Sequence, residues 1–284
     1  MRKYIPERKN LFIFASYPKI LEIESSYLIV GNEENLFKVS FSDIENVFTI
    51  YTFPVWLKHR LMVENLNIFH LDSYGNIKEI KLSKTSQKNI LLDENLTLRL
   101  LMYKAKTINN LFSTSEAEEL LGFSLRKGIP LHQINKYLDF IPEAILMDIL
   151  RLNYRLTEKR ARDISKTVMS LTDNIVPLSF YSKLFEYSLL PDSGFLNEDF
   201  PSLSRDLTEI PRLRFKKKII HLFQTYFFDR KDLSEEYFPK TTIKILKQLS
   251  TYFFYGNRFK RMKNIYYYME AYKRNRLHEV FDCL

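Results

Sequence analysis

Short apolar runs separated by polar turns make up the first part of the chain. The runs are rich in β-branched and aromatic residues, and turn-forming pairs such as Gly31-Asn32 separate them, which is typical of β-strands. One run with helical spacing, at residues 54–63, interrupts them. The runs expected to be strands cover residues 11–14, 20–23, 27–30, 36–41, 66–71 and 77–82. The pattern therefore predicts a small antiparallel β-sheet domain over residues 1–83.

Beyond residue 83 the apolar residues change from the period of strands to that of helices. A polar segment at residues 84–90 is predicted to be an inter-domain linker, and Asp93 is a candidate N-cap for the helix that follows. Further helices are predicted at residues 113–121, ended by Gly122, at 131–138, at 142–154 with Pro142 in its first turn, at 164–171 and at 175–190. The chain is thus predicted to be an α+β protein, with a small N-terminal antiparallel β domain followed by a larger all-α domain at residues 91–284.

The segment from Leu190 to Arg212 contains the residues with the clearest chemistry. A loop leads to Asn197, and a helix is predicted from about residue 202. Asp206 and Glu209 lie three residues apart on that helix, so both carboxylates project from one face. Carboxylates placed in this way can share Mg²⁺ or Mn²⁺, which prefer oxygen ligands. The same spacing also fits an ordinary polar helix face with Asp206 near the positive end of the helix dipole.

The segment resembles the core motif of the CRISPR-associated integrase family. The matching pieces, in order, are Leu190-Pro191, Gly194-Phe195-Leu196, Ser202-Leu203, Asp206-Leu207, Glu209 and Arg212. A looser family pattern runs through the first domain in Ser42-Asp43-Ile44, Asn67-Ile68-Phe69 and Asp72-Ser73-Tyr74-Gly75. The resemblance implies a metal-dependent DNA endonuclease that inserts spacer DNA into CRISPR arrays. It also implies a homodimer held by the β domain and a small second adaptation protein as a partner.

The sequence departs from the family pattern at two ligand positions. Asn197 stands where the family has a metal-binding histidine, and an amide binds a hard cation more weakly and cannot carry a proton near neutral pH. For the family's third ligand, a glutamate, Glu143 is the first candidate and Asp148 the second, whereas Met147 at that position would mean that the ligand is lost. The resemblance therefore implies Glu143, Asn197 and Glu209 as catalytic residues and, together with Asp206, as ligands of Mg²⁺ or Mn²⁺.

Three functions are compatible with these features. The first is an active integrase. The second is a catalytically degenerate homologue that serves as a DNA-binding architectural or regulatory subunit. The third is a basic nucleic-acid-binding protein outside the family. Glu143 itself also fits a first-turn acid that the helix dipole favours, with no role in catalysis.

An excess of positive charge favours a polyanionic partner such as double-stranded DNA. The chain has 43 lysines and arginines against 34 acids, a net charge of +9. The basic residues gather in three places. The first is residues 154–163, the second begins at Arg214 directly after the motif, and the third is residues 252–280, where aromatic residues alternate with them. The candidates for phosphate contacts are Arg160, Arg162, Arg214, Lys216, Lys217, Arg258 and Arg261.

Cysteine usage and hydropathy indicate the compartment. Cys283 is the single cysteine, so neither an internal disulfide nor a cysteine-based metal site can form. No apolar stretch approaches the length of a membrane span, and the first ten residues are polar. We therefore expect a soluble cytoplasmic protein that does not associate with membranes.

Overall fold

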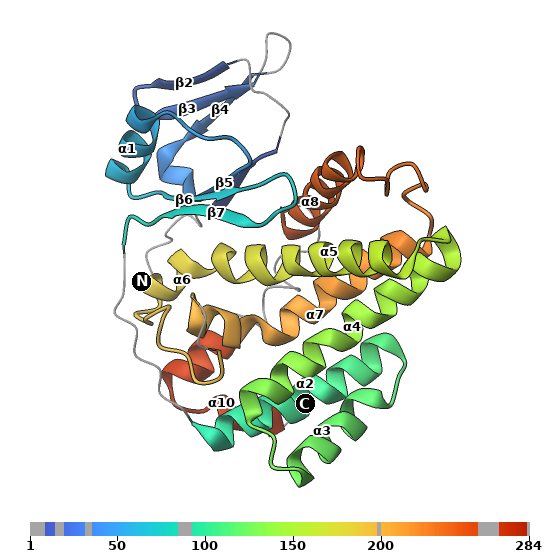
Figure 1. The fold of residues 1–284 in the computed structure, drawn as a ribbon. Coiled ribbons are helices and arrows are strands. Elements are labelled where there is room, and N and C mark those ends of the chain that lie inside the picture. Colours follow the sequence, from blue (N-terminus) through green and yellow to red (C-terminus); the bar gives the residue numbers. More distant parts are fainter. Residues whose placement is uncertain are drawn as a thin grey trace. The chain divides into compact units, whose positions relative to one another are not determined.

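The protein folds into two compact units, Met1–Thr85 and Ser86–Leu284. This computed structural model describes residues 9–14, 20–31, 36–84, 93–197, 200–254 and 267–282 (Figure 1). Most of the predicted linker, residues 85–90, lies outside these ranges. The first unit is built mainly of strands and the second of helices, which confirms the predicted α+β class.

The first unit contains two sheets. Three consecutive strands, β2 (Ile20–Glu24), β3 (Tyr27–Gly31) and β4 (Leu36–Ser40), form an antiparallel sheet. The other sheet has the order β1 (Lys9–Ile13), β5 (Ile44–Thr49), β6 (Asn67–Leu71) and β7 (Ile77–Lys81). Its β1–β5 and β5–β6 pairs are parallel, so the prediction of a purely antiparallel domain is wrong for this sheet. The parallel β5–β6 pair needs a crossover, which helix α1 (Val55–Val63) supplies.

Three asparagines form a ladder across the mixed sheet. The strand register places Asn10 opposite Asn46 and Asn46 opposite Asn67. The Asn46 amide donates to Asn10 Oδ1 at 2.6 Å and accepts from Asn67 Nδ2 at 3.0 Å. Asn67 Oδ1 in turn accepts from the backbone N–H and the hydroxyl of Ser83, at 2.9 and 3.1 Å. The ladder thereby satisfies polar groups inside a sheet whose two inner strands, β5 and β6, are buried at every position.

Replacing Asn46 with alanine is expected to lower the free energy of unfolding by about 2 kcal/mol, because Asn10 and Asn67 each lose a buried hydrogen-bond partner. Urea unfolding of the full chain measures the change. The matched control is Asn76→Ala, since Asn76 is exposed and bonds to Asp72 at the surface. Equal effects of the two substitutions would contradict the role of the ladder.

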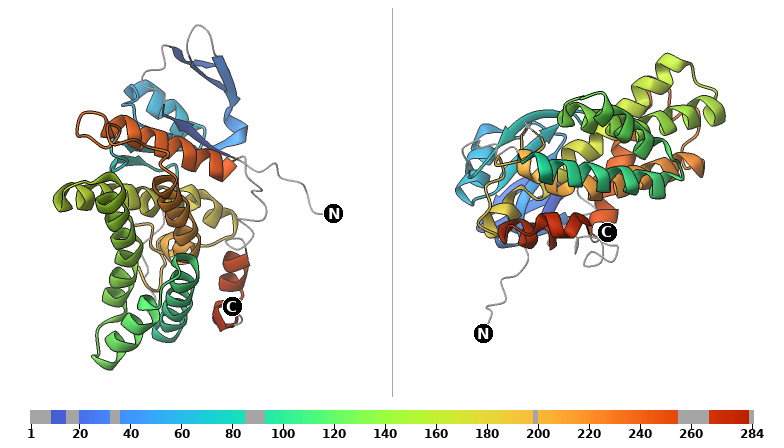
Figure 2. Two further views of the ribbon diagram at one scale, coloured as in Figure 1. Left: turned by 90° about the vertical axis from the view of Figure 1, so that its right-hand side faces the viewer. Right: turned by 90° about the horizontal axis from the view of Figure 1, so that it is seen from below.

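The second unit is a helical bundle around helix α7. The helices are α2 (Glu94–Phe112), α3 (Glu116–Arg126), α4 (Leu131–Tyr154), α5 (Glu158–Ser179), α6 (Tyr181–Glu186), α7 (Ser202–Gln224), α8 (Phe238–Phe254) and α10 (Leu277–Asp282), with a further helical stretch at residues 267–273. Helix α7 packs against α2, α4 and α5 (Figures 1 and 2). Its first turns are buried on all sides, which places Asp206 and Glu209 in the interior of this unit.

Several helices are longer than the sequence pattern predicts. Residues 131–154 form one helix, α4, with Pro142 buried inside it rather than in the first turn of a second helix. Helix α3 continues through Gly122, and residues 164–179 belong to the single helix α5. Tertiary packing of buried apolar faces outweighs the local cost of proline or glycine in these helices. Of the helices within the described residues, none is long and apolar enough to cross a membrane.

Candidate functional site: a buried ion cluster behind the motif loop

Asp206 anchors the motif loop through the loop backbone. Its carboxylate accepts hydrogen bonds from the backbone N–H groups of Phe195, Leu196 and Asn197, at 2.6, 3.0 and 2.8 Å. A Cβ atom at Gly194 would lie 2.8 Å from Asp206 Oδ2, so only glycine allows this close approach. Asp206 is 1% exposed, and its oxygens are directed at the loop. This side chain therefore joins the motif loop to helix α7.

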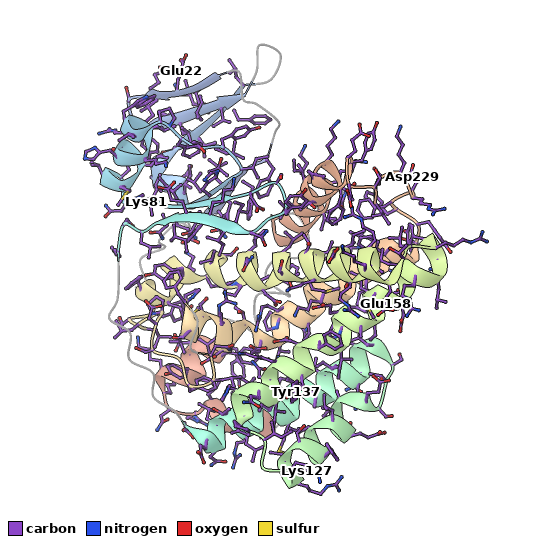
Figure 3. The ribbon with its side chains drawn as sticks, in the orientation of Figure 1. Glu22, Lys81, Lys127, Tyr137, Glu158 and Asp229 are labelled. Carbon is purple, nitrogen blue, oxygen red and sulfur yellow. The ribbon has the colours of Figure 1, made fainter. Side chains whose placement is uncertain are left out.

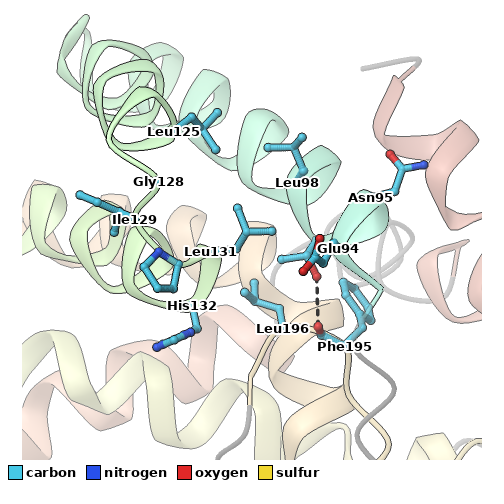
Figure 4. Close-up of a pocket in the computed structure, with 12 residues that line it drawn as sticks. Glu94, Asn95, Leu98, Leu125, Gly128, Ile129, Leu131, His132, Phe195 and Leu196 are labelled. Carbon is cyan, nitrogen blue, oxygen red and sulfur yellow. Dashed lines mark hydrogen bonds between the residues drawn. The ribbon is translucent and has the colours of Figure 1, made fainter.

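Helix α2 holds the other side of the same loop. The Thr97 hydroxyl donates to the Phe195 carbonyl at 3.0 Å, drawn as the dashed line in Figure 4. Beside this contact, the first turns of α2, the connection between α3 and α4 and the motif loop line an open cavity of about 750 Å³. Its walls are mainly apolar, with Leu98, Leu131 and Leu196 directed into it (Figure 4). The loop is thus fixed between α2 and α7.

Asn197 joins the two motif carboxylates. Its Nδ2 donates to Asp206 Oδ1 at 2.6 Å and to Glu209 Oε1 at 3.0 Å. Both amide hydrogens are used in these bonds, because an NH₂ group has two donors. The structure therefore brings three of the four predicted site residues into one hydrogen-bonded group.

Glu209 contacts two buried cations. Lys104 Nζ lies 2.7 Å from Glu209 Oε2, and the Arg212 guanidinium pairs with Oε1. Oε1 also accepts from Asn135 Nδ2 at 3.4 Å. The side chains of Lys104 and Glu209 are both 0% exposed. Each carboxylate oxygen of Glu209 is thus in contact with a positively charged side chain of the protein itself.

These contacts belong to a larger group, here called the buried ion cluster: Lys104, Asp139, Asp173, Glu209, Arg212 and Lys216. Asp139 and Asp173 lie at its edge, with side chains 28% and 27% exposed, and the other four are buried. Lys104 Nζ also contacts Asp139 Oδ1 at 3.0 Å. Asp173 Oδ1 pairs with Arg212 at 2.9 Å and with Lys216 at 3.0 Å, and Lys216 reaches Asp139 at 3.3 Å. Three acids face three bases, so the cluster is neutral as a whole. It connects α2, α4, α5 and α7.

The remaining predicted ligands lie outside this group. Glu143 is half-buried on α4, and within the described residues no hydrogen bond or ion pair joins it to Glu209. Asp148 is exposed and lies 3.8 Å from Arg151, and Met147 is partly buried on the same helix. On α4 it is Asn135 and Asp139 that face Lys104.

Four residues of the site are not among those that the sequence motifs indicate: Lys104, Asn135, Asp139 and Asp173. For Lys104 a signal was present, because it falls between Leu101 and Ala105 on the apolar face of α2, where a lysine requires a buried partner. The other three are polar residues on amphipathic helices, and their spacing contains no sign of a shared partner. Two partners of Lys104 are far from it in the sequence: Asn135 is 31 residues away and Glu209 is 105 residues away.

The predicted DNA contacts divide into exposed and buried residues. Lys216 is 1% exposed inside the buried ion cluster, so the prediction of a surface phosphate contact is wrong for it. Arg160 donates to the Leu233 carbonyl at 2.9 Å and stacks over Phe238, which are internal contacts. Arg162, Arg214 and Lys217 lie at or near the surface. Arg162 pairs with Glu158, which is labelled in Figure 3. Arg258 and Arg261 are outside the described residues.

Burial and neighbouring charges shift the pKa values of the acids of the site in different directions. Burial raises the pKa of Asp206 to about 7, although the hydrogen bonds from Phe195, Leu196 and Asn197 oppose the shift. Burial alone would also raise the pKa of Glu209, but Arg212 and Lys104 outweigh it and keep that pKa below its usual value. The pKa of Asp139 is lowered in the same way, because Lys104, Lys216 and Arg212 outweigh its burial. Glu209 and Asp139 are therefore held in the ionised form by the cations around them.

The contribution of Glu209 to stability is expected to disappear in acid. Because its pKa is lower in the folded chain than in the unfolded chain, its stabilising effect is present above the usual carboxyl pKa of about 4 and is lost as the pH falls below it. The destabilisation caused by Glu209→Gln, measured by urea unfolding, should therefore shrink between pH 6 and about pH 3. A difference that stays constant or grows in acid would contradict the ionised cluster.

The residues present do not fit Mg²⁺ or Mn²⁺. These ions take several oxygen ligands, whereas both Glu209 oxygens already contact cationic side chains and Asp206 is committed to backbone N–H groups. Within the part of the chain that the structure describes, no three Asp, Glu, His or Cys side chains are grouped so that they could hold a metal ion. The buried ion cluster is built as an ion-pair network.

Comparisons with known proteins identify the fold. No protein-family model matches the chain, and no curated protein matches it. The structure is similar to that of a CAS1 protein from Thermotoga maritima, with a TM-score of 0.67 and 12% identity over 96% of this chain and 97% of that one. A chain of a Cas6-RT-Cas1–Cas2 complex gives a TM-score of 0.69 and 14% identity over 96% of this chain and 35% of that one. A casposase bound to integration product gives a TM-score of 0.56 and 15% identity over 85% of this chain and 82% of that one.

These similarities place the protein among chains with an integrase fold. More narrowly, it has the fold of Cas1 proteins along nearly its whole length. This confirms the fold that the motif at Leu190 to Arg212 and the pattern of the first domain imply.

Proposed function

We propose that this chain is a DNA-binding subunit of CRISPR adaptation that does not itself catalyse strand transfer. The Cas1 fold and the net charge of +9 support a role on DNA. The observation that supports the absence of strand transfer is the contact of the two Glu209 oxygens with Lys104 and Arg212. A positive side chain in contact with each oxygen repels the hard cation that strand transfer by this family requires.

A metal-dependent integrase is the second candidate. The convergence of Asn197, Asp206 and Glu209 favours it, since these are the motif residues that the family resemblance implies as ligands of Mg²⁺ or Mn²⁺. For this function Lys104 would have to leave the Glu209 carboxylate, which would expose a charge that has no solvent contact in the folded chain. We therefore place the non-catalytic function first.

The partners we propose are double-stranded DNA, a second copy of the chain and a small second adaptation protein. The similar chain of the Cas6-RT-Cas1–Cas2 complex supports an adaptation partner, and the casposase bound to integration product supports DNA. Arg162, Arg214 and Lys217 are the described residues we assign to phosphate contacts. Binding of this kind is sequence-tolerant and weakens with salt because counterions are released.

DNA binding is tested with a fluorescent duplex in anisotropy titrations between about 50 and 200 mM salt, where we expect the affinity of the natural chain to fall by at least tenfold. Arg214→Glu should weaken binding and flatten the salt dependence. Arg60→Glu, which makes the same charge change at an exposed position of α1, is the matched control. Salt-independent binding, or no binding at low salt, would contradict the DNA-binding role.

Catalysis is tested by incubating the natural chain with a duplex end, a CRISPR repeat substrate and Mn²⁺ or Mg²⁺. We expect no joined or cut product. Asn197→His alone should also give none, because it leaves Lys104 beside Glu209. Product formed by the natural chain and abolished in Glu209→Gln would establish the metal-dependent integrase instead.

A further inference from the structure

Lys104 has the environment of a bound cation rather than that of an ordinary lysine. Its ammonium lies 2.6 Å from Asn135 Oδ1, 2.7 Å from Glu209 Oε2 and 3.0 Å from Asp139 Oδ1. An ammonium has three hydrogens to donate, so these three oxygens satisfy it completely. The oxygens come from α4 and α7, whereas the lysine comes from α2. Its nitrogen therefore occupies a point on which an amide and two carboxylates converge.

The charges of the cluster depend on this one side chain. With Lys104 the three acids and three bases cancel, and without it the cluster carries one excess negative charge, since three acids would face only Arg212 and Lys216. Uncompensated negative charge inside a protein is costly and attracts a replacement cation. Carboxylate and amide oxygens are the ligands that Ca²⁺ and Mn²⁺ accept.

We propose that Lys104 is a resident cation that holds α4 and α7 together and blocks a latent divalent-cation site formed by Asn135, Asp139 and Glu209. Removing the lysine side chain opens that site, and Mn²⁺ or Ca²⁺ then restores the lost contacts between the two helices. The inference deepens the proposed function and rests on it, because the same contact between Lys104 and Glu209 carries both. It requires neither DNA nor a partner protein.

Thermal unfolding in EDTA, in about 5 mM MnCl₂ and in about 5 mM CaCl₂ tests the proposal. The midpoint of the natural chain should be the same in all three. Lys104→Ala should unfold several degrees lower in EDTA and regain about 5 °C or more in at least one of the two cations. Lys106→Ala, on the exposed face of the same helix, removes an equal charge and should show neither effect.

Two further variants separate a cation site from a simple loss of packing. Lys104→Met keeps most of the side-chain volume and removes the charge, so it should be destabilised without regaining stability in the cations. Lys104→Ala combined with Glu209→Gln should lose the rescue as well. If Lys104→Ala does not fold in EDTA, soluble protein obtained only with MnCl₂ or CaCl₂ supports the proposal.

Failure of the cations to rescue Lys104→Ala, whether or not it folds, overturns the proposal. A natural chain that gains several degrees in MnCl₂ overturns it too, since the lysine would then not block the site. Both outcomes can be told apart from failure of the proposed function, because DNA binding and strand transfer of the natural chain are measured separately.

Discussion

Replacing Asp206 with alanine is expected to lower the free energy of unfolding by about 3 kcal/mol or more. The carboxylate is the acceptor for three consecutive backbone N–H groups of the motif loop, at Phe195, Leu196 and Asn197. In the alanine variant these donors lose their partner inside the unit, and each buried donor left without an acceptor costs free energy. Urea unfolding of the full chain measures the effect.

Ser202→Ala provides the matched comparison for Asp206. The Ser202 hydroxyl accepts one hydrogen bond, from the Gly194 N–H at 3.0 Å, on the same loop and helix. Its loss should cost about 1 kcal/mol. If the two variants are equally stable, Asp206 does not hold the loop as the structure indicates.

Replacing Glu209 with glutamine is expected to cost about 3 kcal/mol at neutral pH. The change removes a buried acid and leaves Lys104 and Arg212 with less negative charge around them, and breaking a buried ion pair from one side is strongly destabilising. Glu158→Gln is the control, because the pair of Glu158 with Arg162 is exposed and such pairs contribute at most about 1 kcal/mol. A difference below the error of urea unfolding would mean that the cluster does not stabilise the bundle.

The fold was largely predictable because short apolar runs or helical spacing mark most of its elements. Strands β2, β3 and β6 and helix α1 follow apolar patterns that are local in the sequence. Strand β5 was not predicted, since the polar residues Glu45 and Asn46 interrupt its apolar run although both lie buried inside the sheet. The split of α4 at Pro142 was predicted because a proline suits a first turn as well as a packed helix interior, and only tertiary contacts distinguish the two.

The candidate site was predictable only where its parts are close in sequence. Asn197, Asp206 and Glu209 lie within 12 residues of one another, and a loop that turns back onto its own helix brings them together. Asn135, Asp139 and Asp173 reach the same place through the packing of α4 and α5 on α7, which no spacing rule describes. The spacing of apolar residues on α2 predicts that Lys104 faces the interior, but it does not predict which residues Lys104 contacts there.

Binding of Mn²⁺ to the natural chain, followed by electron paramagnetic resonance in the absence of DNA, tests the central claim most directly. Because Lys104 and Arg212 already contact both oxygens of Glu209, we predict no stoichiometric binding at about 100 μM Mn²⁺. One tightly bound Mn²⁺ per chain, lost in Glu209→Gln, would contradict the account and restore the metal-dependent integrase as the first candidate.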